Sequence, residues 1–367
     1  MNNSTLKSQR ILSIDALRGF DMLMIIFADR FFASLHRGAG TGFTKILADQ
    51  FDHPNWFGFH FYDIIMPLFL FVVGVVIPFS ISKRLTYNPD KRSLYFHLLK
   101  RFLILFALGW VCQGNILALE PGSFHIFSNT LQAIAVGYLF SSIAYIHLSK
   151  NWRYILFVSC LIVYAAILAL PNIPKIGNST LLPDQNYAIY FDRLIMGSLD
   201  DGTQYSWLLS GFGFTATVLS GLFAGELIRS EMKREKVALY LVIIGIFGIA
   251  IGLIWGIWHP IVKKIWSSSF VVFLSGICYI LLAAFYWIID VKGWKNWVLP
   301  FKIIGMNAIT VYVLSHVIPF HRVAGYLLFG LEQYVGNYYQ AITAIGGFGI
   351  LYLILWYMYK NKTFVKI

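Results

Sequence analysis

A histidine and an aspartate ten positions apart precede a long apolar run. They are His53 and Asp63, in the segment "FDHPNWFGFHFYDIIMPLFL" at residues 51–70. An imidazole titrates near neutral pH, so it can act as a general base or as a nucleophile that carries a transferred group. A nearby carboxylate can orient that ring and balance its charge. The pattern therefore makes His53 and Asp63 candidate catalytic residues.

Simpler interpretations of the same loop stay open. A lone loop histidine is usually only solvated, and His60 is a rival for any catalytic role. Asp63 could serve only the dipole of the helix that it starts. Asn55 and Trp56, which follow His53 closely, are the candidate substrate contacts, although the Trp56 ring could instead pack the loop into the protein.

Charged residues also occur within the first long apolar stretch, residues 12–34. On a helix with about 100° per residue, Arg18 and Asp29 lie about 20° apart, with Asp15 about 60° to one side. The three could line one interior groove. Asp29 is then a third catalytic candidate, as a partner for His53, and Arg18 is a candidate cofactor contact. The alternative is that Asp15 and Arg18 simply pair at i and i+3.

Amide side chains interrupt other apolar stretches. They are Asn129, Gln132 and Asn307. A single amide in a helix bundle often only joins two helices, but several of them beside charged residues favour a polar cavity. All three are candidate cofactor contacts, and Asn129 and Asn307 could stabilise negative charge on a carbonyl oxygen. The spacing of Cys, His and acidic residues predicts no metal site.

The composition indicates what must position these residues. The chain has 367 residues, of which 58% are hydrophobic and 13% are charged, whereas a soluble domain carries about 25% charged residues. So few charges cannot cover a soluble surface, and the sequence predicts a multi-pass membrane protein. The net charge of +12 fits Lys and Arg in cytoplasmic loops rather than nucleic-acid binding, because no long basic block occurs.

Apolar runs of about 20 residues can cross a hydrocarbon core about 30 Å thick, and the chain contains about ten of them. They lie approximately at 12–34, 61–82, 96–118, 130–147, 153–171, 207–229, 236–258, 267–289, 300–319 and 339–360. We therefore predict an all-α fold, in which residues 1–367 form a single transmembrane domain.

Basic residues follow every second predicted span. Examples are Arg84, Arg153, Arg229, Lys292 and Lys360. By the positive-inside rule both termini are then cytoplasmic. Lys263 and Lys264 are exceptions, since they fall on the opposite side. The two long external loops, at about 35–60 and 172–206, are candidates for function because loops of this length are usually either functional or disordered.

Several segments, taken in order, resemble the heparan-α-glucosaminide N-acetyltransferase family, and especially its bacterial, glucosamine-acetylating members. They are "SIDALRGFDMLMII" (13–26), "FDHPNWFGFHFYDIIMPLFLFVVGVVIPFS" (51–80), "SNTLQAIAVGYL" (128–139), "TVLSGLFAGELIR" (217–229), "PIVKKIWSSSFV" (260–271) and "GMNAITVYVLSHV" (305–317). The resemblance runs from about residue 10 to the C-terminus, and it is specific for the family but not for a substrate.

This resemblance implies a transmembrane acetyltransferase. The family moves acetyl from cytoplasmic acetyl-coenzyme A to the amine of glucosamine or a terminal glucosaminide across the membrane, here the bacterial inner membrane, on its periplasmic side. By this resemblance, His53 corresponds to the catalytic histidine of the family, and Asp63 corresponds to a family aspartate ten residues later. Two positions depart from the family pattern: this chain has Asp29 where the family has an asparagine, and Ala133 where many members have an arginine. The acceptor chemistry and one coenzyme A contact are therefore open.

Acetyl-coenzyme A, the implied co-substrate, is a polyanion whose phosphates would bind basic residues at the cytoplasmic face. Arg84 and Arg101 are the candidates, although both also suit the positive-inside rule. The pantetheine arm would reach inward to His53. The histidine then acts either as the base for the amine or as an acetyl carrier in two steps.

The main alternative function is a transporter of a sugar or sugar derivative. Such proteins often contain inverted repeats with broken helices at matching positions, and the sequence has no evident symmetry of that kind. Acyl transfer to another envelope acceptor is also open, as are the acyl chain length and the oligomeric state, for which a homodimer is one option. The expected partners are acetyl-coenzyme A, an amino sugar and the lipid bilayer.

Overall fold

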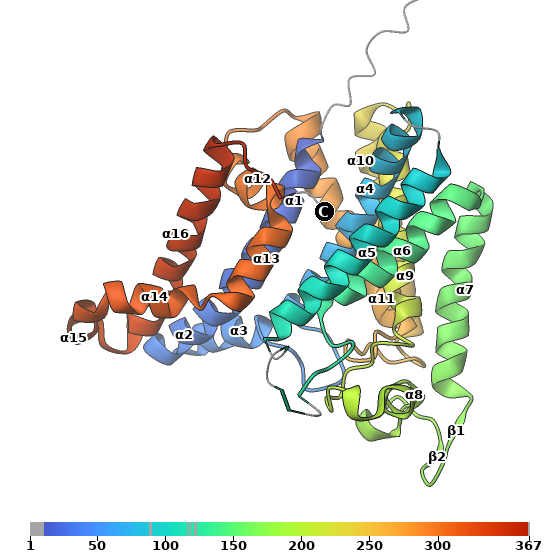
Figure 1. The fold of residues 1–367 in the computed structure, drawn as a ribbon, viewed down its shortest axis with the longest axis horizontal. Helices are drawn as coiled ribbons and strands as arrows, with labels where there is room; N and C mark the ends of the chain where they lie inside the picture. Colours follow the sequence, from blue (N-terminus) through green and yellow to red (C-terminus); the bar gives the residue numbers. More distant parts are fainter. Residues whose placement is uncertain (1–10, 88–89, 115, 117–118, 121–122, 366–367) are drawn as a thin grey trace, which may run out of the picture.

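The computed structural model describes residues 11–87, 90–114, 116, 119–120 and 123–365, and it consists mainly of helices (Figure 1). The α-helices are α1 (Leu12–Leu23), α2 (Asp29–Ala39), α3 (Gly42–Gln50), α4 (Ile65–Tyr87), α5 (Lys91–Gln113), α6 (Thr130–His147), α7 (Lys150–Ala169), α8 (Tyr187–Met196), α9 (Gly211–Arg229), α10 (Arg234–Trp255), α11 (Ser268–Tyr286), α12 (Leu299–Met306), α13 (Ala308–Val317), α14 (Phe320–Leu327), α15 (Glu332–Val335) and α16 (Tyr339–Lys360). Among the described residues, the strands are β1 (Asn172–Ile173) and β2 (Gly177–Asn178), which pair antiparallel.

Seven of the described helical segments are long and apolar enough to cross a membrane. They are Phe61–Thr86, Lys91–Gln113, Lys150–Ala169, Gly211–Arg229, Arg234–Trp255, Ser268–Val291 and Phe329–Lys360. Together with the low content of charged residues, these segments identify a multi-pass helical membrane protein. The predicted fold class is thus confirmed at this level.

Three predicted spans fall outside that set. The span predicted at 12–34 is divided into α1, a π-helical turn at Met24–Ala28, and α2. The span at 130–147 coincides with α6. The span at 300–319 is two short helices, α12 and α13, that meet at Asn307. Figure 1 shows α1, α6 and α13 alongside the longer helices. The span predicted at 96–118 ends at a residue that lies outside the described part of the chain.

The helix pairs α4–α9 and α1–α12 pack with their backbones in contact. A Cβ atom at Gly221 of α9 would lie 1.9 Å from the carbonyl oxygen of Phe71 in α4, and one at Gly19 of α1 would lie 1.8 Å from that of Phe301 in α12. Glycine at such crossings lets membrane helices approach closely. These contacts fix α4, which continues from Asp63, and α1, which carries Arg18.

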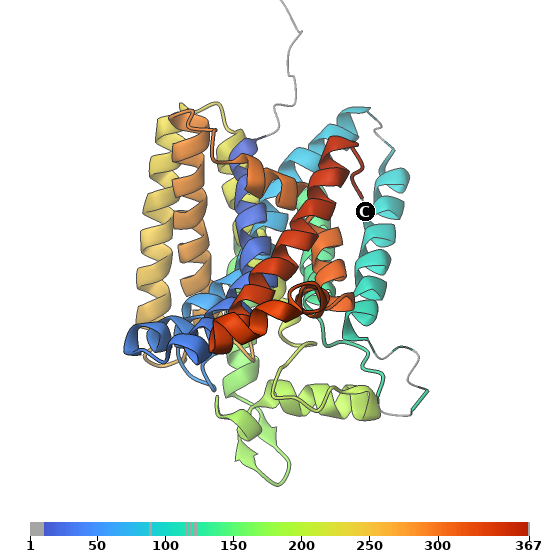
Figure 2. The ribbon, with the colours of Figure 1, turned by 90° about the vertical axis from the view of Figure 1, so that its left-hand side faces the viewer.

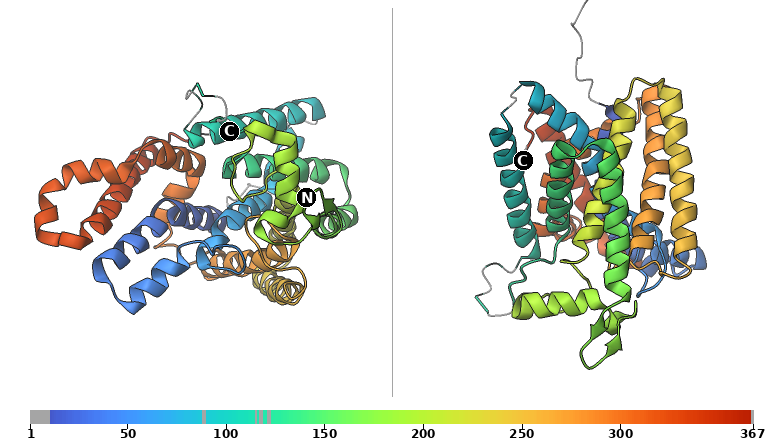
Figure 3. Two further views of the ribbon diagram at one scale, coloured as in Figure 1. Left: turned by 90° about the horizontal axis from the view of Figure 1, so that it is seen from below. Right: turned by 90° about the vertical axis from the view of Figure 1, so that its right-hand side faces the viewer.

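The first and the last long helices of the described chain have their outer ends at the same end of the helix bundle. In Figures 1 and 2, α1 starts and α16 stops at the upper end, whereas α2, α3, α14 and α8 lie across the lower end. Seen from below, α2 and α3 lie beside the segment of α14 and α15, and α8 crosses another part of that end (Figure 3). The segment between α3 and α4, which contains His53, therefore lies at the lower end.

The predicted external loop at 35–60 contains helical structure. Gly40, with a φ of 60°, ends α2, and a positive φ is readily adopted by glycine. The Thr41 side chain then caps α3 by accepting a hydrogen bond from the backbone N–H of Thr44 at 3.3 Å. The second predicted loop, 172–206, contains the β1–β2 hairpin and α8.

Candidate active site

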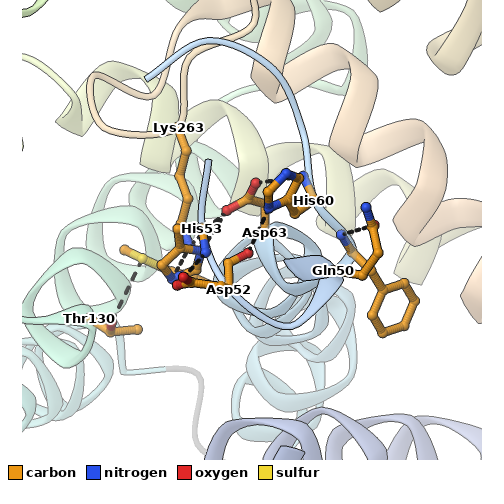
Figure 4. Close-up of polar contacts among 9 residues, drawn as sticks. Gln50, Asp52, His53, His60, Asp63, Thr130 and Lys263 are labelled. Carbon is orange, nitrogen blue, oxygen red and sulfur yellow. Dashed lines mark hydrogen bonds and ion pairs between the residues drawn. The ribbon is translucent and has the colours of Figure 1, made fainter. Parts of the chain in front are cut away.

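The His53 side chain lies between two buried charged residues at the lower end of the bundle (Figure 4). Its Nδ1 atom is 2.7 Å from Oδ1 of Asp63. The Nζ atom of Lys263 is 3.1 Å from Nδ1 and 3.0 Å from Nε2 of the same ring. Lys263 Nζ also lies 3.2 Å from Asp63 Oδ1. These three residues, hereafter the His53 cluster, are all in mutual contact.

Burial differs across the His53 cluster. The Asp63 side chain is fully buried, that of Lys263 is 10% exposed and that of His53 is 33% exposed. Burial lowers the pKa of Lys263 to about 8, because desolvation of the ammonium outweighs the stabilising charge of Asp63. Since His53 is the most exposed member, a substrate would meet the cluster at the imidazole.

The start of the α4 segment orients Asp63. A short 3₁₀ turn, Phe61–Ile64, leads into α4. Oδ2 of Asp63 accepts a hydrogen bond from the backbone N–H of His60 at 3.0 Å, so the carboxylate caps its own helix and also faces His53. The His60 ring has a different partner, because its Nδ1 lies 3.0 Å from the carbonyl oxygen of Asp52. Of the two rival histidines, His53 is thus the one whose ring hydrogen-bonds to Asp63.

Contacts with two other loops anchor the segment that carries His53. The backbone N–H of Gly58 donates to the carbonyl oxygen of Ile261 at 3.1 Å. The indole Nε1 of Trp56 donates to the carbonyl oxygen of Leu181 at 2.7 Å. Trp56, a predicted substrate contact, is only 7% exposed, so its ring joins the loops together. Asn55, the other predicted substrate contact, is exposed.

A tight turn between α10 and α11 presents Lys263. Ser267 donates its hydroxyl to the carbonyl oxygen of Pro260 at 2.9 Å, which closes the turn. Trp266 has a φ of 50°, and bulky residues in this left-handed region are rare and concentrated at functional sites. Sequence reasoning did not select Lys263. The available signal was its position, with Lys264, on the side of the membrane where basic residues are scarce.

Asp29 lies at the start of α2 and lines a cavity of about 530 Å³. Its side chain is exposed, and Oδ1 accepts a hydrogen bond from the backbone N–H of Arg30 at 2.5 Å. Asp29 and His53 are close enough to interact electrostatically. Other residues that line the cavity belong to α13, α14 and α16, among them Ser315, His316, His321, Arg322 and Phe348.

The π-helical turn at Met24–Ala28 alters the helix face predicted for this segment. A π turn has a wider hydrogen-bond spacing than an α turn, so Asp29 does not keep the rotational position that an ideal α-helix assigns relative to Arg18. Asp15 is buried, whereas Asp29 is exposed. Arg18 lies within electrostatic range of Asp21, which is fully buried. The predicted single groove of Asp15, Arg18 and Asp29 is therefore not formed as a regular α-helical face.

The three predicted amide residues have defined partners. Asn129 caps α6, and Gln132 Oε1 accepts from the backbone N–H of Asn129 at 3.1 Å. The Gln132 Nε2 atom also donates to the carbonyl oxygen of Ile126 at 3.1 Å. Both Oε1 and Nε2 of Gln132 are therefore hydrogen-bonded to the backbone at the start of α6. Oδ1 of Asn307 accepts from the backbone N–H of Val365 at 3.3 Å. Its buried Nδ2 has no hydrogen-bond partner within the described part of the chain, and is available to a ligand.

Of the predicted basic contacts, Arg84 lies far from the His53 cluster, and Arg101 lies near the middle of α5. Arg84 follows Asp63 by about 21 residues of helix, which corresponds to ~30 Å along its axis. The guanidinium of Arg101 lies 4.2 Å from the centre of the Tyr138 ring. Both arginines are within electrostatic range of His97. Arg84, in the last turn of α4, thus lies toward the end of the bundle opposite His53, and Arg101 lies between the two ends.

This arrangement is suited to proton transfer or nucleophilic attack by an imidazole. The buried carboxylate on Nδ1 favours the tautomer with hydrogen on that atom, so the lone pair of the ring lies on Nε2, where Lys263 Nζ is 3.0 Å away. Within the described residues, no three His, Cys, Asp or Glu side chains converge to form a metal-binding group. The chemistry that the site offers therefore comes from His53, Asp63 and Lys263.

Comparisons with known proteins give the chain a family. A family model described as "Heparan-alpha-glucosaminide N-acetyltransferase, catalytic" matches residues 10–246, a region that includes His53 and Asp63. Curated relatives named "Heparan-alpha-glucosaminide N-acetyltransferase", from Homo sapiens and Mus musculus, are each 24% identical over 98% of this chain. The chain spans 60% and 61% of their respective lengths. Because the matched region covers well over half of its residues, the chain belongs to the heparan-α-glucosaminide N-acetyltransferase family.

Proposed function

We propose that this protein is a transmembrane acetyltransferase. It moves acetyl from cytoplasmic acetyl-coenzyme A to the amine of glucosamine, or of a terminal glucosaminide, on the periplasmic side of a bacterial inner membrane. The observation that carries this proposal is the 2.7 Å contact between His53 Nδ1 and the fully buried Asp63. The names of the related proteins support the acceptor class and the reaction.

His53 has one of two roles in this reaction, and both use Nε2. As a general base, Nε2 removes a proton from the amine while the amine attacks the thioester carbonyl. As a nucleophile, Nε2 attacks the carbonyl itself, forms an acetyl-imidazole and then passes acetyl to the amine. Asp63 holds the ring and stabilises positive charge on it in either route.

The donor enters from the opposite end of the bundle. Arg84 at that end, with Arg101 further along α5, would bind the phosphates of acetyl-coenzyme A, and the buried Nδ2 of Asn307 would donate to the pantetheine arm or thioester. We further propose about ten membrane crossings, with the arginine-bearing end of the bundle and both termini on the cytoplasmic side. The start of α1 and the end of α16 at one end of the bundle support this orientation (Figure 1).

The acceptor enters through the cavity that Asp29 lines. A volume of about 530 Å³ lies within the range of about 300–1,000 Å³ that is usual for small-molecule sites. The carboxylate of Asp29 would bind the ammonium form of the amino sugar and guide it toward His53. Asp29 lies within electrostatic range of His53, which supports this path.

Asp29→Asn is expected to raise the KM for the amino sugar by about tenfold, the equivalent of about 1.4 kcal/mol of binding. The loss arises because the amide keeps the shape of the side chain but not its charge. The KM for acetyl-coenzyme A should stay unchanged, as should both values in the control variant Asp49→Asn, whose carboxylate is exposed on α3 and does not line the cavity. An unchanged KM for the amino sugar would remove Asp29 from the acceptor site.

The function is tested with purified protein in sealed vesicles. Labelled acetyl-coenzyme A is supplied on the side of Arg84, and a panel of amino sugars is supplied on the other side. The expected result is an N-acetylated sugar that depends on both substrates. Uptake of unmodified sugar without acetyl transfer would contradict the proposal and favour the transporter alternative.

A further inference from the structure

Lys263 is the member of the His53 cluster that the sequence did not select, and it lies beyond the region that the family model matches. Its Nζ atom contacts both nitrogens of the His53 ring and one oxygen of Asp63. We propose that Lys263 is the general acid of the acetyl transfer, and that it works with His53 as a directly connected acid–base pair. This inference rests on the proposed function and adds a catalytic residue to it.

The geometry places an acid beside the reacting nitrogen. Lys263 Nζ lies 3.0 Å from Nε2 of His53, which is the atom that acts as base or nucleophile. A thioester with its carbonyl carbon facing Nε2 carries its sulfur one bond further on, within reach of Nζ. Asp63, at 3.2 Å from Nζ, holds the ammonium in place and balances its charge.

The proton transfers balance in the direct route. As the amine nitrogen bonds to the carbonyl carbon, His53 Nε2 takes the proton that the amine loses. As the carbon–sulfur bond breaks, Lys263 gives a proton to the departing sulfur, which leaves as a thiol. His53 then passes its proton to Lys263 across their 3.0 Å contact. An amine and a thioester have become an amide and a thiol, and both side chains have returned to their starting states.

The two-step route uses the same pair. Nε2 of His53 attacks the carbonyl carbon, the carbon–sulfur bond breaks, and Lys263 protonates the sulfur. The amine then attacks the acetyl-imidazole and gives its proton to Lys263, which is now neutral. In both routes Lys263 must release and recover a proton. Arginine cannot do this, because its pKa lies above about 12.

The acidity of Lys263 suits this task. An acid works best when its pKa lies near the working pH. Burial lowers the pKa of Lys263 to about 8, whereas an ordinary lysine has a pKa of about 10.4 and a thiol about 8.5. The neighbouring Lys264 lacks this setting, since its Nζ atom lies 3.5 Å from Gln204 Oε1 and outside the His53 cluster.

The test compares Lys263→Arg and Lys263→Met with the matched control Lys264→Arg, in folded, purified protein with acetyl-coenzyme A and glucosamine. Both Lys263 variants should lose about 10²–10⁴-fold in kcat, with little change in either KM. Wild-type kcat should fall as the pH rises through about 8, where Lys263 loses its proton, and this fall should be absent in Lys263→Arg. Lys264→Arg should behave as wild type.

A second donor separates acid catalysis from structural support. An acetyl thioester of a more acidic aryl thiol releases a thiolate that needs no proton, so the defect of both Lys263 variants should shrink with it. The ratio of rates on the two donors does not depend on the amount of folded protein. If Lys263→Met fails to fold, Lys263→Arg carries the test.

Two results would overturn the inference while leaving the proposed function intact. One is wild-type kcat in Lys263→Arg, which would make Lys263 only an ion-pair partner of Asp63. The other is an equal defect on both donors. A wild-type protein that acetylates no amine from acetyl-coenzyme A would instead overturn the proposed function, and the inference with it.

Discussion

His53→Ala is expected to lower kcat for acetyl transfer by about 10²–10⁴-fold. The variant lacks the ring nitrogen that takes the proton or the acetyl group. The fold should survive. The side chain is one-third exposed, and Asp63 and Lys263 still pair at 3.2 Å after its removal, so no buried charge is left alone. The measurement is kcat with acetyl-coenzyme A and glucosamine, together with the midpoint of thermal unfolding.

His60→Gln provides the comparison with the rival histidine of the same loop. The His60 ring faces the carbonyl oxygen of Asp52, while its backbone N–H, which the substitution keeps, binds Asp63. We therefore expect most of the activity to remain. Retained transfer in His53→Ala, combined with loss in His60→Gln, would move the catalytic role to His60.

The same pair of proteins distinguishes the two chemical routes. Labelled acetyl-coenzyme A is added without an acceptor. In the two-step route the wild-type protein keeps the label until an amino sugar is added, whereas His53→Ala never acquires it. In the direct route neither protein is labelled, and coenzyme A is released only when the amino sugar is present.

The sequence predicted the parts of the molecule that depend on composition or on near neighbours. A low charge content summed over the chain was enough to predict a membrane helix bundle. The contact of His53 with Asp63 joins residues ten positions apart across a turn, and both were selected together. Lys263 is 210 residues from His53 in the chain, so only the folded structure brings them together. A basic residue on the side with few others was the remaining signal.

Other differences arose where a regular element was assumed. A helical-wheel argument placed Arg18 and Asp29 on one face, but the π-helical turn at Met24–Ala28 lies between them. Trp56 was a candidate substrate contact with packing of the loop as the alternative, and its indole bonds to Leu181, which is 125 residues away in the sequence. The apolar run at 300–319 was taken as one helix although Asn307 interrupts it, and the structure breaks the helix at that residue.

Asp63→Asn is expected to lower kcat by about 10³–10⁴-fold while leaving the size and shape of the side chain unchanged. The Asp63 carboxylate accepts from the backbone N–H of His60 at 3.0 Å and also faces Nδ1 of His53 at 2.7 Å. An amide has one acceptor oxygen. If that oxygen stays with His60, the NH₂ group faces Nδ1, which must then accept a hydrogen bond. The ring is forced into the tautomer with hydrogen on Nε2, and that atom can no longer act as base or nucleophile.

The same substitution also changes the pH dependence through Lys263. The negative charge of Asp63 raises the pKa of Lys263, so its loss takes that pKa below about 8. The residual rate of Asp63→Asn should therefore fall at a lower pH than the wild-type rate, since Lys263 is deprotonated earlier. Asp52→Asn is the matched control: Asp52 accepts from the backbone N–H of His53 at 2.8 Å but is exposed, and asparagine can make the same contact. Equal losses in the two variants would mean that Asp63 acts only through the loop backbone.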